Sequence, residues 1–188
     1  MNMTLKRQLK VAAVTIGLAM AGNIGAVSAA DDVLVIGAPL ALTGGLADEG
    51  KKQQDVWKLW LDKINAAGGI DVDGKKMQVK FVEYDYQTDG KRAGQLAEKL
   101  ITDDNVDVIM APFGSGHTKI IAAVAERYQV PMLACVASSV SVYDQGFKYL
   151  FGTLAPNTGM TESMVEFFKE KSPDLKTVAV YGRDDVFP

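Results

Sequence analysis

Residues 33–50 read VLVIGAPLALTGGLADEG, and this stretch decides the fold class. Its first part, Val33 to Leu40, is a continuous apolar run, which is typical of a strand covered on both faces. A loop rich in Gly and Thr follows. The next segment predicts an amphipathic helix, whose apolar stripe consists of Val56, Leu59, Trp60 and Ile64. Strand, loop and helix in this order predict the first unit of an α/β fold.

The same alternation continues along the chain. Further strands are predicted at residues 77–84, 106–110, 131–136, 147–153 and 177–181. Helices are predicted between them, and Asp89 is placed to cap one helix while Gly68 and Gly69 end another. We therefore expect a three-layer α/β fold with a largely parallel sheet and helices on both faces. Within the first helix we expect Trp60 in the core and Trp57 partly exposed.

The first thirty residues have the pattern of a secretory signal peptide. Lys6, Arg7 and Lys10 precede an apolar run from Val11 to Met20, and small residues follow through Ala30. The run is shorter than the roughly 20 residues that span a bilayer, so a retained membrane anchor is the weaker alternative. Cleavage would leave a mature chain that begins near Asp31.

Composition excludes several classes of protein. One Cys and one His cannot form an internal disulfide or a four-ligand zinc site, and the sequence has neither a G-x-G-x-x-G motif nor a P-loop, so we predict neither a metal nor another cofactor. Loss of the three basic residues of the signal peptide would change the formal net charge from −3 to −6. An acidic chain lacks the basic face that binds a phosphate backbone, so a nucleic-acid partner is not expected.

Three loops follow the carboxyl ends of predicted strands, at residues 42–50, 111–118 and 137–141. Ligands of open α/β sheets bind at that edge, where small residues allow close approach to the backbone. The hydroxyl groups available there to a carboxylate belong to Ser115, Thr118, Ser138 and Ser139. Each Ser or Thr alone could serve only a turn or a helix cap. The convergence of three such loops indicates a ligand site.

Five motifs carry a family resemblance: IGAPLALTGGLADEG, INAAGGI, VEYDYQTDGKRA, IMAPFGSGHT and VPMLACVASSV. In this order and spacing they resemble the first lobe of periplasmic solute-binding proteins of ABC importers, specifically the branched-chain amino acid-binding family. The resemblance implies a type I periplasmic-binding fold, in which two α/β lobes joined by a hinge trap the ligand. Residues 31–153 would form the first lobe, and residues 154–188 the hinge and the beginning of the second. The chain would then be an N-terminal fragment; a complete single domain with a frayed tail is the alternative.

The resemblance also implies a function. The protein would capture an amino acid or a related small polar molecule in the periplasm and deliver it, as a monomer, to a membrane permease. A ligand sensor that signals to a receptor or regulator is the alternative within the same fold. An enzyme is not expected, because Cys135 and His117 are the only nucleophile and base of a hydrolase type and no G-x-S-x-G motif is present.

Site residues follow from the same resemblance. Ser115, Ala137 and Ser139 match positions that bind the carboxylate and ammonium groups of an amino acid, and Phe187 matches an aromatic residue that covers the ligand. Glu49 stands where the relatives carry a Tyr that touches the ligand side chain, which would suit a cationic or hydrogen-bonding ligand; a solvated loop Glu is the alternative. His117 lies next to the predicted site, where it either contacts the ligand or faces solvent.

Overall fold

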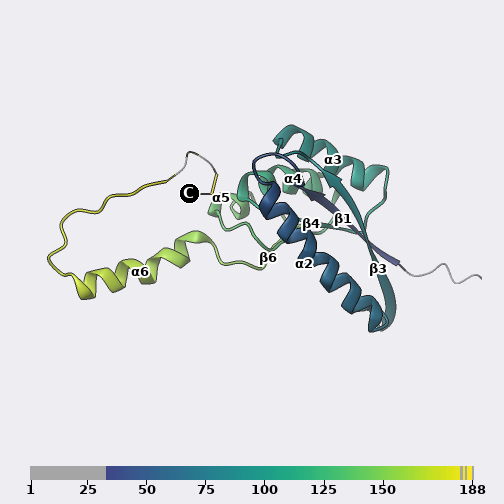
Figure 1. The fold of residues 1–188 in the computed structure, drawn as a ribbon, viewed down its shortest axis with the longest axis horizontal. Coiled ribbons are helices and arrows are strands. Elements are labelled where there is room, and N and C mark those ends of the chain that lie inside the picture. Colours follow the sequence, from purple (N-terminus) through teal and green to yellow (C-terminus); the bar gives the residue numbers. More distant parts are fainter. Residues whose placement is uncertain (1–32, 183, 185, 188) are drawn as a thin grey trace, which may run out of the picture. The chain divides into compact units, whose positions relative to one another are not determined.

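The structure is a computed structural model that describes residues 33–182, 184, 186 and 187. The predicted signal peptide, residues 1–30, lies outside the described residues. The strands are β1 (Val33–Leu40), β2 (Ile70–Val72), β3 (Lys75–Asp85), β4 (Val108–Met110), β5 (Met132–Ala134) and β6 (Leu150–Gly152). The helices are α2 (Ala47–Ala66), α3 (Gly90–Thr102), α4 (Ser115–Tyr128), α5 (Val140–Tyr143) and α6 (Asn157–Lys171). Figure 1 shows their arrangement.

The strands form one sheet in the order β2-β3-β1-β4-β5-β6. Strands β3, β1, β4, β5 and β6 run parallel, and only β2 is antiparallel, because it is joined to β3 by a tight turn. Asp89 caps α3 by accepting a hydrogen bond from the Arg92 N–H at 2.6 Å, as its position before the helix predicted. The predicted α/β fold with a largely parallel sheet is confirmed.

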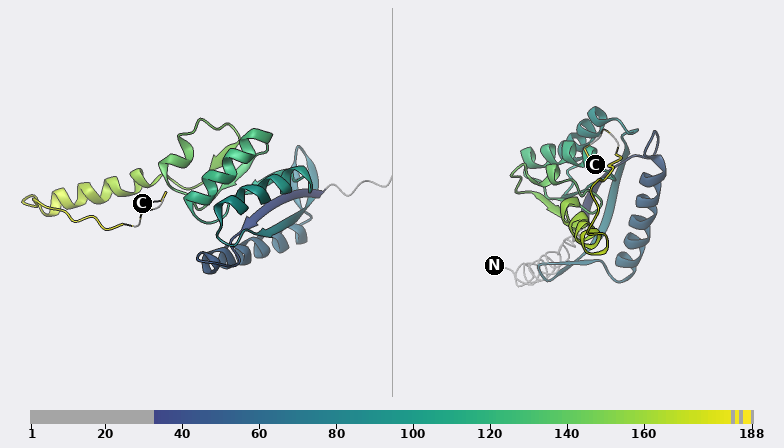
Figure 2. Two further views of the ribbon diagram at one scale, coloured as in Figure 1. Left: turned by 90° about the horizontal axis from the view of Figure 1, so that it is seen from above. Right: turned by 90° about the vertical axis from the view of Figure 1, so that its left-hand side faces the viewer.

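Helices cover both faces of the sheet (Figure 2). Alternate residues of β1 and β3 point to opposite sides, so each strand contributes to two clusters. On one side Val35, Val82 and Tyr84 pack against the buried faces of α3 and α4. On the other side α2 packs over a smaller cluster that contains Ala38, Leu40, Trp57 and Phe81. The central strand β1 is thus apolar on both faces because both faces are covered.

The buried face of α2 differs from the predicted one. Trp57 is 6% exposed and its ring stacks on Phe81, with ring centroids 5.6 Å apart, whereas Trp60 is 38% exposed. Val56 and Leu59, which the apolar stripe placed inside, are 63% and 56% exposed. The expectation for the two tryptophans was therefore wrong. The reason lies in Gly50, two turns before Trp57 on the same face: it lets α2 approach the loop after β1 so closely that a Cβ at Gly50 would lie 1.9 Å from the Ala41 carbonyl oxygen.

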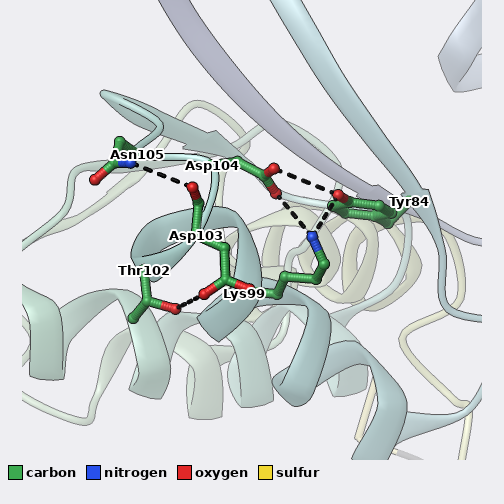
Figure 3. A network of polar contacts seen from close by, with 6 residues as sticks. All are labelled: Tyr84, Lys99, Thr102, Asp103, Asp104 and Asn105. Atoms are coloured by element: carbon green, nitrogen blue, oxygen red, sulfur yellow. Dashed lines mark hydrogen bonds and ion pairs between the residues drawn. The ribbon is translucent and has the colours of Figure 1, made fainter.

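A polar network ties the end of α3 to β3 (Figure 3). The Lys99 ammonium donates to the Tyr84 hydroxyl at 2.7 Å and lies 3.6 Å from the Asp104 carboxylate. It also stands 4.7 Å from the centre of the Tyr84 ring. The hydrogen bond with Tyr84 raises the pKa of Lys99, although burial opposes the change, and the nearby carboxylates of Asp104 and Asp103 contribute in the same direction.

The predicted strand at residues 177–181 is absent. These residues belong to no helix or strand, and Val178, Val180 and Tyr181 are 71%, 93% and 102% exposed. A strand forms only when its backbone groups pair with a neighbour, and no described strand lies beside this segment. The helix predicted around residues 161–171 is present as α6, but none of its residues is buried.

Replacement of Trp57 provides a test of the observed packing of α2. Trp57→Ala is expected to lower the free energy of unfolding by about 3–5 kcal/mol, because it opens a cavity against Phe81. Trp60→Ala, the matched control, is expected to cost roughly 1 kcal/mol, since it removes only an edge contact with Phe81. Urea unfolding followed by circular dichroism measures both values. A larger loss for Trp60→Ala would contradict the packing described here.

Candidate functional site

The loop after β1 is held by one carboxylate, that of Asp85 at the end of β3. Its Oδ1 accepts hydrogen bonds from the backbone N–H groups of Leu42, Thr43 and Gln87 at 2.9, 3.3 and 2.8 Å, and its Oδ2 accepts from the Thr43 hydroxyl at 2.7 Å. Burial raises the pKa of Asp85, but these four hydrogen bonds outweigh it and the net effect lowers the pKa. The ionised carboxylate therefore joins the LTGG turn to the turn after β3.

Thr88 completes this junction. Its hydroxyl accepts from the Leu46 N–H at 3.1 Å and donates to the Thr43 carbonyl at 2.9 Å. The turn after β3 is thus bonded through the Thr88 side chain to the backbone of the loop after β1. The consequence for the site is that Leu46 and the Thr88 carbonyl are held in defined positions at the carboxyl edge of the sheet.

The loop after β4 is held by a side chain of α2. The Gln53 amide donates to the Ala111 carbonyl at 2.9 Å and accepts from the Phe113 N–H at 2.8 Å. This pair of bonds satisfies backbone groups on both sides of Pro112. The loop is therefore positioned before α4 begins.

Helix α4 begins without a side-chain cap. Gly114, its N-cap residue, has a φ of 97°, a left-handed value that favours glycine. Thr118 is the first residue of the helix whose N–H is bonded within the described chain, to the Gly114 carbonyl at 3.2 Å. The N–H groups of Ser115, Gly116 and His117 are left for another acceptor. Such a helix end attracts anions.

A cavity of about 550 Å³ opens at this helix end. It is lined by Leu46, Phe113, Gly114, Ser115, Gly116, His117, Val136, Ser138, Leu154, Met160, Val186 and Phe187. The three loops predicted to converge each contribute to this lining. The lining residues include no Asp, Glu, Lys or Arg, so backbone N–H groups, two serines and one histidine supply its polarity.

Two of the predicted site residues, Ser115 and Ser139, are bonded to each other, and a third, Ala137, is bonded to Tyr143. Ser115 is 1% exposed and lines the cavity, and its Oγ accepts a hydrogen bond from the Ser139 N–H at 3.2 Å. Ala137 and Ser139 are buried behind the lining. The Ala137 carbonyl accepts from the Tyr143 hydroxyl at 2.6 Å. Burial raises the pKa of Tyr143, and Cys135 adds to the effect, so this hydroxyl remains a donor.

The other two predicted residues are placed differently. Phe187 lines the cavity and is 46% exposed, and its carbonyl accepts from the Asn157 side-chain amide at 2.9 Å. Glu49 lies in the first turn of α2, outside the lining, and its carboxylate binds the Lys52 ammonium at 3.2 Å. A contact between Glu49 and a ligand stays a prediction.

Sequence reasoning missed most of the apolar lining. Phe113 stands within the quoted motif IMAPFGSGHT and Val136 within VPMLACVASSV, so the motifs could have indicated them. Leu154 and Met160 carry no motif and reach the cavity only through the path of the chain after β6. His117, left open between ligand and solvent, lines the cavity.

The described residues form neither a metal site nor a membrane-spanning helix. No group of three or more His, Cys, Asp or Glu side chains in residues 33–182, 184, 186 and 187 could hold a metal ion. None of the helices described has both the length and the apolar character needed to cross a membrane.

The sequence profile of the family named periplasmic binding protein matches residues 33–188. The chain belongs to this family. Its members are solute-binding proteins, and the relatives below confirm the resemblance to branched-chain amino acid-binding proteins.

A curated relative is the leucine-, isoleucine-, valine-, threonine- and alanine-binding protein of Pseudomonas aeruginosa, 28% identical over 81% of this chain and 39% of that protein. Among solved structures, the branched-chain amino acid transporter substrate binding protein LivJ from Streptococcus pneumoniae, in complex with isoleucine, is 29% identical. Its TM-score is 0.65, over 74% of this chain and 38% of that one. A solute binding protein from Rhodopseudomonas palustris in complex with 3,4-dihydroxybenzoic acid, 22% identical, has a TM-score of 0.65 over 75% and 37% of the two chains and shows the shared fold. The chain thus spans about two-fifths of the length of these relatives.

The lowered pKa of Asp85 predicts an acid-sensitive junction. A carboxyl group whose pKa is lower in the folded state contributes stability above its unfolded pKa, and that contribution is lost as the pH falls through the folded pKa. Asp85→Asn is expected to lower the free energy of unfolding by about 1 kcal/mol at neutral pH, a small value because the group is partly exposed. The difference from the unmodified chain should shrink as the pH falls through the lowered pKa of Asp85.

Urea unfolding at a series of pH values measures this difference. Asp73→Asn is the matched control, because Asp73 is exposed in the turn between β2 and β3 and has no hydrogen bond or ion pair with other described residues. A stability difference for Asp85→Asn that persists unchanged into acid would refute the proposed junction.

Proposed function

We propose that this chain forms the first ligand-binding lobe of an extracytoplasmic solute-binding component of an ABC importer. It captures an amino acid or a related small polar molecule and presents it to a membrane permease. The observation that carries the proposal is the uncapped start of α4 inside a cavity whose walls are otherwise largely apolar. Membership of the periplasmic binding protein family supports it.

The arrangement of polar and apolar groups suggests how the ligand lies. Its carboxylate faces the free N–H groups of α4 and the Ser115 hydroxyl. The oxygen of that hydroxyl accepts from the Ser139 N–H, which leaves its hydrogen for the ligand. Its apolar part faces Leu46, Phe113 and Val136. Backbone dipoles rather than a basic side chain then neutralise the anion, as at other helix N-termini.

The remaining features of the proposal concern the whole protein. Residues 31–153 form the first lobe, and residues 154–188 form the hinge and the beginning of a second lobe that closes over the ligand. Phe187, on the cavity wall, belongs to this second part. We propose a binding role without catalysis, in a monomer, and the solute-binding character of the family supports the absence of catalysis.

Substitution of Ser115 tests the carboxylate site. Ser115→Ala is expected to weaken every accepted acid by a similar factor of at least about tenfold, the value of one hydrogen bond to a charged group. A thermal-shift screen of amino acids, small amides and aromatic acids measures the change. Unchanged affinities in Ser115→Ala would contradict the carboxylate site.

Glu49→Gln, measured in the same screen, tests whether Glu49 affects which ligands are preferred rather than how tightly all of them bind. If Glu49 faces the variable part of the ligand, the ranking of ligands changes while the carboxylate contribution remains. An unchanged ranking would leave Glu49 as the partner of Lys52 alone.

Export of the chain is the second part of the proposal. The basic residues, apolar run and small residues before Asp31 predict removal of residues 1–30 during secretion to the periplasm. Expression in a bacterium with an outer membrane, followed by fractionation and N-terminal sequencing, should recover from the periplasm a chain that begins near Asp31. Accumulation of the full-length chain in the cytosol would contradict export.

A further inference from the structure

The contact of His117 with Thr88 determines which of its two ring nitrogens can accept a hydrogen bond. His117 lines the cavity, and its Nε2 lies 3.2 Å from the Thr88 carbonyl oxygen. A carbonyl oxygen only accepts hydrogen bonds, so Nε2 must carry the hydrogen. In the neutral ring Nδ1 is then unprotonated and can only accept. Nδ1 makes no hydrogen bond with the described residues.

The ring is held in this orientation from two sides. The Tyr86 ring lies against it, with centroids 4.9 Å apart and an interplanar angle of 36°. Thr88, which receives the Nε2 hydrogen, is itself bonded to Leu46 and Thr43 of the first loop. The acceptor is therefore prepared by the fold before a ligand arrives, which lowers the cost of binding.

Two backbone acceptors of the loop after β5 already receive hydrogen bonds within the chain. The Ala137 carbonyl receives the Tyr143 hydroxyl, and the Ser138 carbonyl receives the Asn157 N–H at 2.7 Å. The same turn of α4 that carries His117 offers donors, namely its free backbone N–H groups. A ligand that places an anion at these donors brings its neighbouring atoms close to the His117 ring.

We propose that His117 is a specificity-determining residue of the site, whose Nδ1 accepts a hydrogen bond from an ammonium or hydroxyl group beside the ligand's carboxylate. The inference rests on the proposed function, because it assumes that the carboxylate binds at the start of α4. The site then selects α-amino and α-hydroxy acids over the same acid without such a group. A ligand with a second anionic group at this position would be rejected, because an unprotonated Nδ1 has no hydrogen to donate and repels another acceptor.

The first test observes the ring directly. His117 is the only histidine of the chain, so the ring nitrogen resonances of the ¹⁵N-labelled protein belong to it alone. When the ring is neutral they should show the Nε2–H tautomer, and L-leucine should shift the Nδ1 resonance while isocaproate, which lacks the ammonium group, should not. An Nδ1–H form in the free protein would overturn the inference without reference to any ligand.

The second test compares three acids that differ in one group: L-leucine, leucic acid with a hydroxyl in place of the ammonium, and isocaproate with neither. Amide shift titrations of the full chain at millimolar ligand measure their affinities. Leucine and leucic acid should bind about tenfold more tightly than isocaproate, the value of one hydrogen bond.

Two variants separate the acceptor from the structural contact with Thr88. His117→Gln can still donate to the Thr88 carbonyl but has no acceptor at the position of Nδ1, and should lose the preference over isocaproate. His117→Asn can place its amide oxygen near the position of Nδ1, and should keep the preference while losing the contact with Thr88. Thermal unfolding of both variants reports whether each folds, and the ring measurement on the unmodified chain stands if either does not.

The outcomes distinguish the inference from the function on which it rests. Equal affinities of the three acids for the unmodified chain, or a preference that survives in His117→Gln, would overturn the role of His117 alone. If none of the three acids shifts the resonances of the cavity residues, the proposed carboxylate site fails, and the inference fails with it.

Discussion

The hydrogen bonds to the Asp85 carboxylate are the constraint on which the site depends. β1 and β3 are adjacent parallel strands, so the loops that leave their carboxyl ends begin side by side. Asp85 joins these loops by four hydrogen bonds, and Thr88 adds two more. From this junction the structure supports Leu46 on one wall of the cavity and the His117 ring on another. A loop of small residues, with little apolar surface to bury, acquires a fixed shape in this way.

In the proposed function, recognition rests on neutral groups. The cavity lining includes no charged side chain, and the anion-attracting element is the uncapped start of α4. Backbone N–H groups held by a helix need no reorganisation when an anion binds, and a neutral lining avoids the cost of burying an unpaired charge. Residues outside the lining hold the lining in position. Gln53 bonds to the loop before α4, and the Ser139 N–H bonds to Ser115.

Periodicity predicted the elements of the fold well, because it reports which residues avoid water. The apolar run of β1, the two-sided pattern of β3, the cap at Asp89 and the glycines after α2 all appear as expected. Periodicity did not predict the buried face of α2 correctly. Val56, Leu59 and Trp60 form the stronger apolar pattern, yet the close approach at Gly50 turns Trp57 inward. A glycine contact between distant segments has no periodic signature.

The sequence by itself determined the α/β alternation and the edge of the sheet at which three small-residue loops gather. These follow from local patterns and from the rule that parallel strands present their carboxyl ends together. Tertiary structure decided which groups face the cavity. It placed Ala137 and Ser139 behind the lining, paired Glu49 with Lys52, and turned one nitrogen of His117 to Thr88. For His117 and Ser139 the physical reason is that hydrogen-bond partners 20 or more residues apart along the chain position them, and the sequence does not show which partners meet.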